Sequence, residues 1–181
     1  MPDVAHAAFV RSPFPHARIE SIDASEARQV PGVVAVITGE EMKQFTNPMM
    51  GLVSLKGLAN PPFYPLAIDK VRLVGDPVAI VVAESRAIAE DARQVVAVDY
   101  EPLEPVATFE DALAEDAPLV WEGEDTNVMF RDSHSHGDVD QVFAEADQVI
   151  TETFSQHRYA NVPMETLGVV AEVEEGKEVT V

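Results

Sequence analysis

VGDPVAIVVAESRAIAEDARQVVAVDYEPLEPV, residues 74–106, decides the fold of this chain. Residues 77–83 form a continuous apolar run, which is typical of a strand buried on both faces. Ser85 is a candidate N-cap, and apolar residues then recur at helical spacing over residues 88–96. Apolar and polar residues alternate over residues 96–100, before two prolines. The stretch therefore predicts a strand, a helix and a strand in a βαβ-like unit.

The same rules predict shorter elements on both sides of this unit. Predicted strands cover residues 4–10, 17–22 and 33–38, and extended segments are predicted over 66–74 and, at greater length, over 149–159. Predicted short helices begin at Asp23 or Ser25, at Gly39, at Thr108 in a capping box, and at Gly137. A hairpin is predicted over residues 169–181, with its turn at 175–177. Its return strand would end unpaired, so we expect the chain to be part of a longer polypeptide.

Composition narrows the function classes. The chain of 181 residues has a net charge of −20 and no cysteine, which excludes disulfides, thiolate metal ligands and a cysteine nucleophile within it. Residues 101–181 hold 20 acids and three bases, whereas residues 1–100 hold 12 acids and nine bases. Nucleic acid and anionic membranes are poor partners for such a surface. Without an apolar run long enough to span a bilayer or a secretory signal, we expect a cytoplasmic protein.

Three blocks of sequence carry a family resemblance. HAAFVRSPFPHARIESIDASEARQVPGVVAVITGEE, residues 6–41, resembles the start of the large, molybdenum-binding subunit of the xanthine dehydrogenase/aldehyde oxidase family. Residues 74–106 resemble the next signature of that region. Residues 137–173, GDVDQVFAEADQVITETFSQHRYANVPMETLGVVAEV, resemble the start of the cofactor-binding region that follows. The three blocks stand in the family's order and cover most of the chain.

The resemblance implies a fold. The class is α+β, with an α/β hammerhead domain over residues 1–106, a connector over 107–131, and the first elements of a truncated molybdopterin-binding domain over 132–181. Within the family, residues 163–166 (PMET) are similar to large subunits of the carbon monoxide dehydrogenase type.

The resemblance also implies an activity for the intact protein. It would be an oxidoreductase that oxidises an aldehyde, an N-heterocycle or carbon monoxide with water as the oxygen source. Its cofactor would be molybdenum on molybdopterin cytosine dinucleotide, and its partners FAD-binding and 2Fe–2S subunits or domains, in a dimer of heterotrimers. The family's glutamine motif, glycine-rich loops and catalytic glutamate would lie beyond Val181, so this chain alone should be inactive and bind no cofactor. The alternative hypothesis is a non-catalytic hammerhead-type scaffold or interaction module.

Two groups of residues are candidates for a site. His134 and His136 would share one face of a strand, and with neighbouring aspartates they suit zinc, copper or nickel. The same segment also reads as a polar connector in which Asp138 begins a helix. The resemblance places His157, Met164 and Glu165 close to the family's active-site region, whereas the simpler interpretation makes Glu165 a structural hydrogen-bond acceptor. The Gly75-Asp76-Pro77 sequence lacks the glycine spacing of a nucleotide loop and predicts a tight turn.

Overall fold

The computed structural model describes residues 4–49, 51, 55–157, 159, 162–165, 168–173 and 179–180. The chain divides into two compact units, Met1–Ser133 and His134–Val181, and each is described by itself. Among the described residues, no helix is long and apolar enough to cross a membrane.

The first unit contains two three-stranded sheets in which every strand pair is antiparallel. Sheet A has the order β1 (His6–Arg11), β5 (Pro77–Ala83), β3 (Val33–Thr38). Sheet B has the order β4 (Lys70–Val71), β2 (Ala17–Asp23), β6 (Ala97–Pro102). The strands β3 and β5 begin and end where the apolar runs predict. The predicted extended segment 66–74 contains only the two residues of β4.

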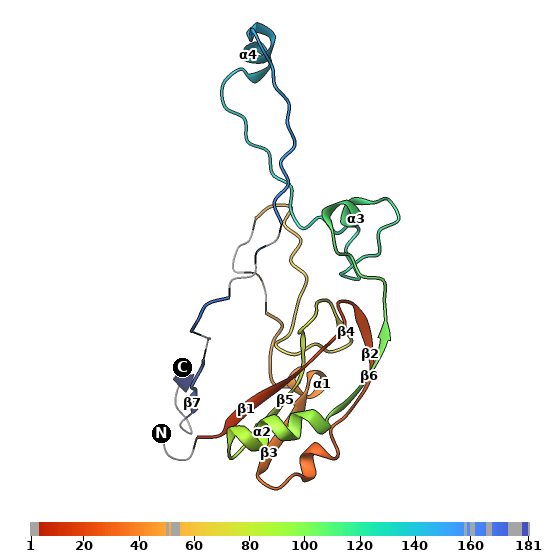
Figure 1. Cartoon of the computed structure of the whole chain (residues 1–181), viewed down its shortest axis with the longest axis vertical. Coiled ribbons are helices and arrows are strands. Elements are labelled where there is room, and N and C mark those ends of the chain that lie inside the picture. The colour runs from red at the N-terminus through yellow and green to blue at the C-terminus, as the bar shows by residue number, and fades with distance from the viewer. Residues whose placement is uncertain are drawn as a thin grey trace. The chain divides into compact units, whose positions relative to one another are not determined.

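Short helices lie between these strands, and one more, α3 (Phe109–Leu113), follows β6 (Figure 1). Those between the strands are η1 (Ala27–Gln29), α1 (Gly39–Met42), α2 (Arg86–Ala92) and η2 (Arg93–Val95). The predicted helix over 88–96 is therefore an α-helix that tightens into a 3-10 turn. The helix α2 lies against β1, β5 and β3.

The central β5–α2–β6 segment has the predicted order of elements but not the predicted βαβ character. In a βαβ unit both strands lie parallel in one sheet. Here β5 is already paired on both edges, by β1 and β3, so neither edge is open to β6. The strand β6 pairs with β2 in sheet B instead. The βαβ-like prediction is wrong because it considered only the local sequence and not the strands that compete for the edges of β5.

The hydrophobic core lies between the two sheets. One cluster joins Val36 and Val81 of sheet A to Ala92 and Val96, and a second joins Val78 of β5 to residues of sheet B. A third cluster of alanines, Ala8, Ala83 and Ala89, lies where α2 meets sheet A. Small side chains at this contact let the helix backbone approach the strands closely.

Most of the described helices begin at a residue whose side chain accepts a hydrogen bond from a backbone N–H of the first turn. The Ser85 hydroxyl accepts a hydrogen bond from the backbone N–H of Ile88, which confirms the predicted cap of α2. Thr108 forms the predicted capping box at α3. The predicted cap by Asp23 or Ser25 is wrong, since η1 has no side-chain cap. The Asp23 carboxylate accepts from the N–H of Ser25 instead, in a local turn two residues on.

The second unit contains one helix and one hairpin. The helix α4 (Val139–Glu145) begins at Asp138, whose carboxylate accepts from the N–H of Gln141, as its cap role predicts. The strands β7 (Glu172–Val173) and β8 (Val179–Thr180) form the predicted antiparallel pair. The turn predicted at 175–177 lies outside the described residues, and so does Val181. The described part of 149–159 is assigned to neither a helix nor a paired strand, so the predicted extended stretch has no strand partner there.

Candidate functional site

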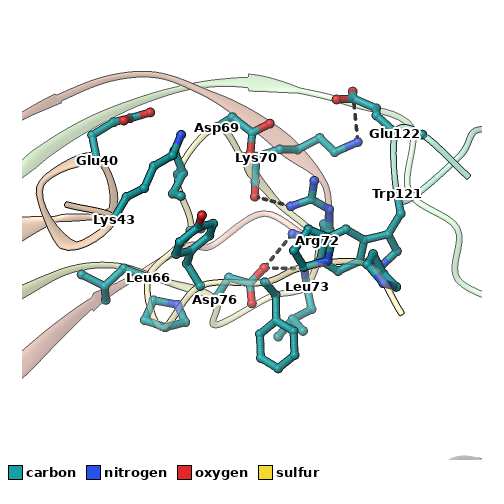
Figure 2. A pocket seen from close by; sticks show the side chains of 18 of the residues that line it. Glu40, Lys43, Leu66, Asp69, Lys70, Arg72, Leu73, Asp76, Trp121 and Glu122 are labelled. Carbon is teal, nitrogen blue, oxygen red and sulfur yellow. Dashed lines mark hydrogen bonds and ion pairs between the residues drawn. The ribbon is translucent and has the colours of Figure 1, made fainter. Parts of the chain in front are cut away.

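An open pocket of about 750 Å³ lies in the first unit. Its lining comes from α1, from the loop over residues 61–69, from β4 and the turn that follows it, and from residues 121–124 (Figure 2). Apolar and aromatic side chains such as Phe63, Tyr64 and Trp121 share the walls with charged groups. Segments that lie more than 80 residues apart in the chain therefore meet at one place.

A turn at Gly75 shapes one side of this pocket. Gly75 has a φ of 94°, which favours glycine. The Asp76 carboxylate accepts hydrogen bonds from the backbone N–H groups of Arg72 (2.7 Å) and Leu73 (3.2 Å). The predicted tight turn is present, and the Asp76 carboxylate stabilises it by binding backbone N–H groups.

Arg72 ties this turn to the segment on the opposite wall. Its guanidinium lies over the ring of Trp121, 4.0 Å from the centroid. Its Nε donates to the carbonyl of Val120 (3.0 Å), and one terminal nitrogen donates to the carbonyl of Lys70 (3.1 Å). Burial lowers the pKa of Arg72, and the carboxylates of Asp69, Glu122 and Asp76 act in the opposite direction. The group stays a cation because its ordinary pKa lies far above neutrality.

Lys70 is the most unusual residue of the lining, since a lysine is rarely enclosed. Its side chain is only 2% exposed, and its Nζ lies 3.3 Å from Oε1 of Glu122. The same carboxylate oxygen lies 3.4 Å from a terminal nitrogen of Arg18. Glu122 is half exposed and so supplies negative charge to both cations from the edge of the pocket.

The chemistry of the pocket is that of a charged recess. Its lining holds five carboxylates (Glu40, Asp69, Asp76, Glu122 and Glu124) and three cations (Lys43, Lys70 and Arg72). None of the lining residues is a serine, threonine, cysteine or histidine. The recess can hold polar or cationic groups, and its lining offers no thiol or imidazole and, as its hydroxyl, only that of Tyr64.

A second buried polar group lies near the end of β6. His16 lies in the bend before β2 and is 5% exposed. Its Nδ1 donates to the carbonyl of Glu104 (2.7 Å), because a carbonyl only accepts. Its Nε2 has no hydrogen-bond partner in the part of the chain that the structure describes. Nearby, burial raises the pKa of Tyr100, and the Ser12 hydroxyl opposes that rise.

The sequence-predicted site residues all lie in the second unit, and each of them is exposed. His157 packs its ring against Tyr159, with centroids 4.6 Å apart. Among the residues that the structure describes, no hydrogen bond, ion pair or ring contact joins His157 to Met164 or Glu165, so a shared site for these three stays a prediction. His134 and His136 are not part of any cluster of three or more metal-ligating side chains within the described ranges.

The pocket residues were missed by sequence reasoning. Lys70, Arg72 and Glu122 were not singled out, because burial of a lysine and a contact across 52 residues leave no local pattern. The sequence feature that could have pointed to this pocket is the chain's one tryptophan, Trp121, which lies within an otherwise acidic connector.

Comparison with known proteins gives two family matches. Residues 1–104 match the family model described as aldehyde oxidase and xanthine dehydrogenase, a/b hammerhead domain. Residues 120–181 match the model described as molybdopterin cofactor-binding domain. The two matches account for most of the chain.

Individual relatives agree with these matches. The chain is 40% identical over 169 residues to the nicotine 6-hydroxylase large subunit of Paenarthrobacter nicotinovorans, covering 93% of this chain and 21% of that one. It is 36% identical over 190 residues to the carbon monoxide dehydrogenase large chain of Afipia carboxidovorans, covering 98% and 23%.

A solved structure gives the same result. Quinoline 2-oxidoreductase from Pseudomonas putida 86 superposes with a TM-score of 0.75 at 36% identity, over 82% of this chain and 19% of that one. The chain thus spans about a fifth of the length of the curated relatives described here.

Proposed function

The chain belongs to the aldehyde oxidase and xanthine dehydrogenase family, and from this we propose that it works as part of a molybdenum hydroxylase large subunit. The observation that carries the proposal is the order of the two family matches, a hammerhead domain followed by a molybdopterin-binding domain. We assign residues 1–106 to the hammerhead domain, 107–131 to the connector, and residues from 132 onward to the molybdopterin-binding domain.

The proposed reaction is an oxidation in which water supplies the oxygen atom. The substrate class stays among aldehydes, N-heterocycles and carbon monoxide, because relatives named for nicotine and for carbon monoxide show nearly equal identity to this chain. The relatives are named as large subunits or large chains. This supports partner subunits, for which we propose FAD-binding and 2Fe–2S chains in a dimer of heterotrimers in the cytoplasm.

The proposed cofactor is molybdenum on molybdopterin, in the cytosine dinucleotide form, which supplies the redox chemistry when it is bound. The residues of this chain that the structure describes do not fit it. Five carboxylates line the pocket against three cations, and Lys70 is already paired with Glu122, so an anionic pyrophosphate would be repelled. In the second unit residues 134–157, 159, 162–165 and 168–172 are all exposed, so these side chains do not enclose a cavity for a pterin. We therefore assign no cofactor ligand to this chain.

The experiment that tests the proposal is purification of the native protein from its source through an antibody against residues 1–106. We expect molybdenum, iron and FAD to copurify with the chain, as measured by metal analysis and by the flavin spectrum. Oxidation of an aldehyde or N-heterocycle, or of carbon monoxide, by a dye-linked assay should accompany them. A stable monomer without molybdenum or flavin would contradict the proposal and favour the scaffold hypothesis.

A further inference from the structure

Within the first unit, a segment of the connector packs against residues that precede it in the chain. We call residues 118–129 the strap. Its Asn127 side chain bonds back to Val120 and Pro118, each at 3.0 Å, and so holds the strap in a closed loop. The carbonyl of Met129 accepts from the N–H of Ala59 (2.8 Å). The strap is thus a folded piece of chain with its own internal support.

Most of the strap lies within one family match, and it packs on residues of the other. Residues 120–129 fall within the range of the molybdopterin-binding match. Their partners Arg18, Lys70 and Arg72 fall within the hammerhead match. The boundary between two sequence families is therefore bridged by direct contacts inside a single compact unit.

Charge is concentrated at one point of the strap. One oxygen of Glu122 lies 3.3 Å from Nζ of the buried Lys70 and 3.4 Å from Arg18. Figure 2 shows Lys70 reaching along the top of the pocket to Glu122, while the Arg72 guanidinium lies beside Trp121 in this view. A buried ammonium needs a counter-charge, and Glu122 is the carboxylate that the ion pairs of the described residues assign to it.

We propose that Glu122 is a latch. By neutralising the enclosed Lys70 it holds the strap on the hammerhead domain, keeps the wall of the pocket in place, and fixes where the chain leaves that domain. Releasing the latch swings Trp121 away from Arg72 and exposes the Lys70 ammonium. The latch is independent of the proposed enzyme activity, and it needs no cofactor to be tested.

Two readouts follow from the structure. Trp121 is the only tryptophan of the 181-residue chain, so its fluorescence reports on the strap alone. Lys70 can be labelled with an amine-reactive ester and followed by peptide mass mapping, with the exposed Lys56 as an internal reference.

The test compares Glu122→Gln with Glu124→Gln in the full chain. Glu124 is a nearby carboxylate of the same strap and has no ion pair among the described residues. We expect Glu122→Gln to shift Trp121 emission to longer wavelength and to raise Lys70 labelling about tenfold relative to Lys56, since a charged hydrogen bond to a buried group is lost. Glu124→Gln should match the wild type.

The proposal is overturned if Glu122→Gln folds by circular dichroism yet leaves both readouts unchanged, or if both variants behave alike. If Glu122→Gln does not fold, the proposal is tested on the wild-type chain, by measuring Lys70 labelling at increasing concentrations of sodium chloride. Because Glu122 is half exposed, salt screens its ion pairs, so Lys70 labelling should rise with sodium chloride. Labelling that is independent of salt would overturn the latch.

Discussion

At one position of the first unit, Gly39, the fold leaves no room for a side chain. Gly39 is buried at the start of α1, and a Cβ there would lie 2.1 Å from the carbonyl oxygen of Ala67. Backbone atoms cannot move aside as the end of a flexible side chain does. The contact between α1 and the segment before β4 therefore requires glycine for space rather than for its φ angle.

We predict that Gly39→Ala lowers the free energy of unfolding by about 1–3 kcal/mol, the usual range for overpacking. Urea denaturation followed by circular dichroism measures the change. Gly168→Ala is the control, because a Cβ at Gly168 meets nothing within 4 Å. Equal transition midpoints for the two variants would contradict the prediction.

Glu41 links stability to pH at the same helix. Its carboxylate accepts from the backbone N–H of Thr38 (2.8 Å) and pairs with Arg28 (2.7 Å). These contacts, the Thr38 hydrogen bond foremost, lower the pKa of Glu41 below its ordinary value of 4.5, against the effect of desolvation. A lowered folded-state pKa means that this stabilisation is present above pH 4.5 and is lost as pH falls through the folded pKa.

The free energy of unfolding should therefore decrease below pH 4.5, and Glu41→Gln should flatten that decrease. Denaturation series between pH 7 and about pH 3 measure it. Glu40→Gln is a matched control, since Glu40 is the neighbouring carboxylate on the same helix and has no ion pair in the described residues. An identical acid dependence in the wild type and Glu41→Gln would refute the role of Glu41.

At the scale of elements, helix caps and buried strands could be predicted from the sequence because each depends on only a few neighbouring residues. The ends of β3 and β5, the Ser85 cap and the Thr108 capping box all agree with prediction. The strand with which β6 pairs could not be predicted from the sequence. It depends on which strand edges are already occupied, and β1, the partner that closes one edge of β5, lies about 70 residues away in sequence.

Removing the cap of α2 should have a measurable cost. We predict that Ser85→Ala lowers the free energy of unfolding by about 1 kcal/mol, because the N–H of Ile88 loses its acceptor. Thermal or urea unfolding shows the change. Ser135→Ala, at an exposed residue outside any helix, should leave stability unchanged. A Ser85→Ala midpoint within error of wild type would rule out the contribution of the cap.

At the scale of the whole molecule, the two units differ in how they bury apolar surface. The first has a continuous core between its sheets. In the second, large apolar side chains are exposed, among them Val142, Phe143, Ile150 and Phe154, the last at 92%. Backbone hydrogen bonds that are open to water exchange more readily than those of a packed core.

Amide hydrogen exchange should therefore be slower over residues 78–100 than over residues 147–181. Mass spectrometry of peptic peptides at neutral pH measures the difference. Sedimentation of the same sample serves as the control, because a dimer could supply a partner edge to the second unit. Equal or stronger protection of residues 147–181 in a monomer would contradict the prediction.

The candidate site was harder to predict than the fold. Sequence reasoning examined histidines and the Met164-Glu165 pair, which carry chemistry by residue type. The pocket instead depends on Lys70, Arg72 and Glu122, whose types are those of an ordinary surface. Their significance comes from burial and from partners 48 and 52 residues away, neither of which a local pattern encodes.

The sequence by itself determined the family, the α+β class, and the position of most short elements, since family motifs, periodicity and caps are local properties of the chain. Only the tertiary structure decided that β5 and β6 lie in different sheets, and that Lys70 is enclosed and bound to Glu122 of the strap. The physical reason is the same in both cases. Strand edges and buried charges are satisfied by whichever distant groups the fold brings to them.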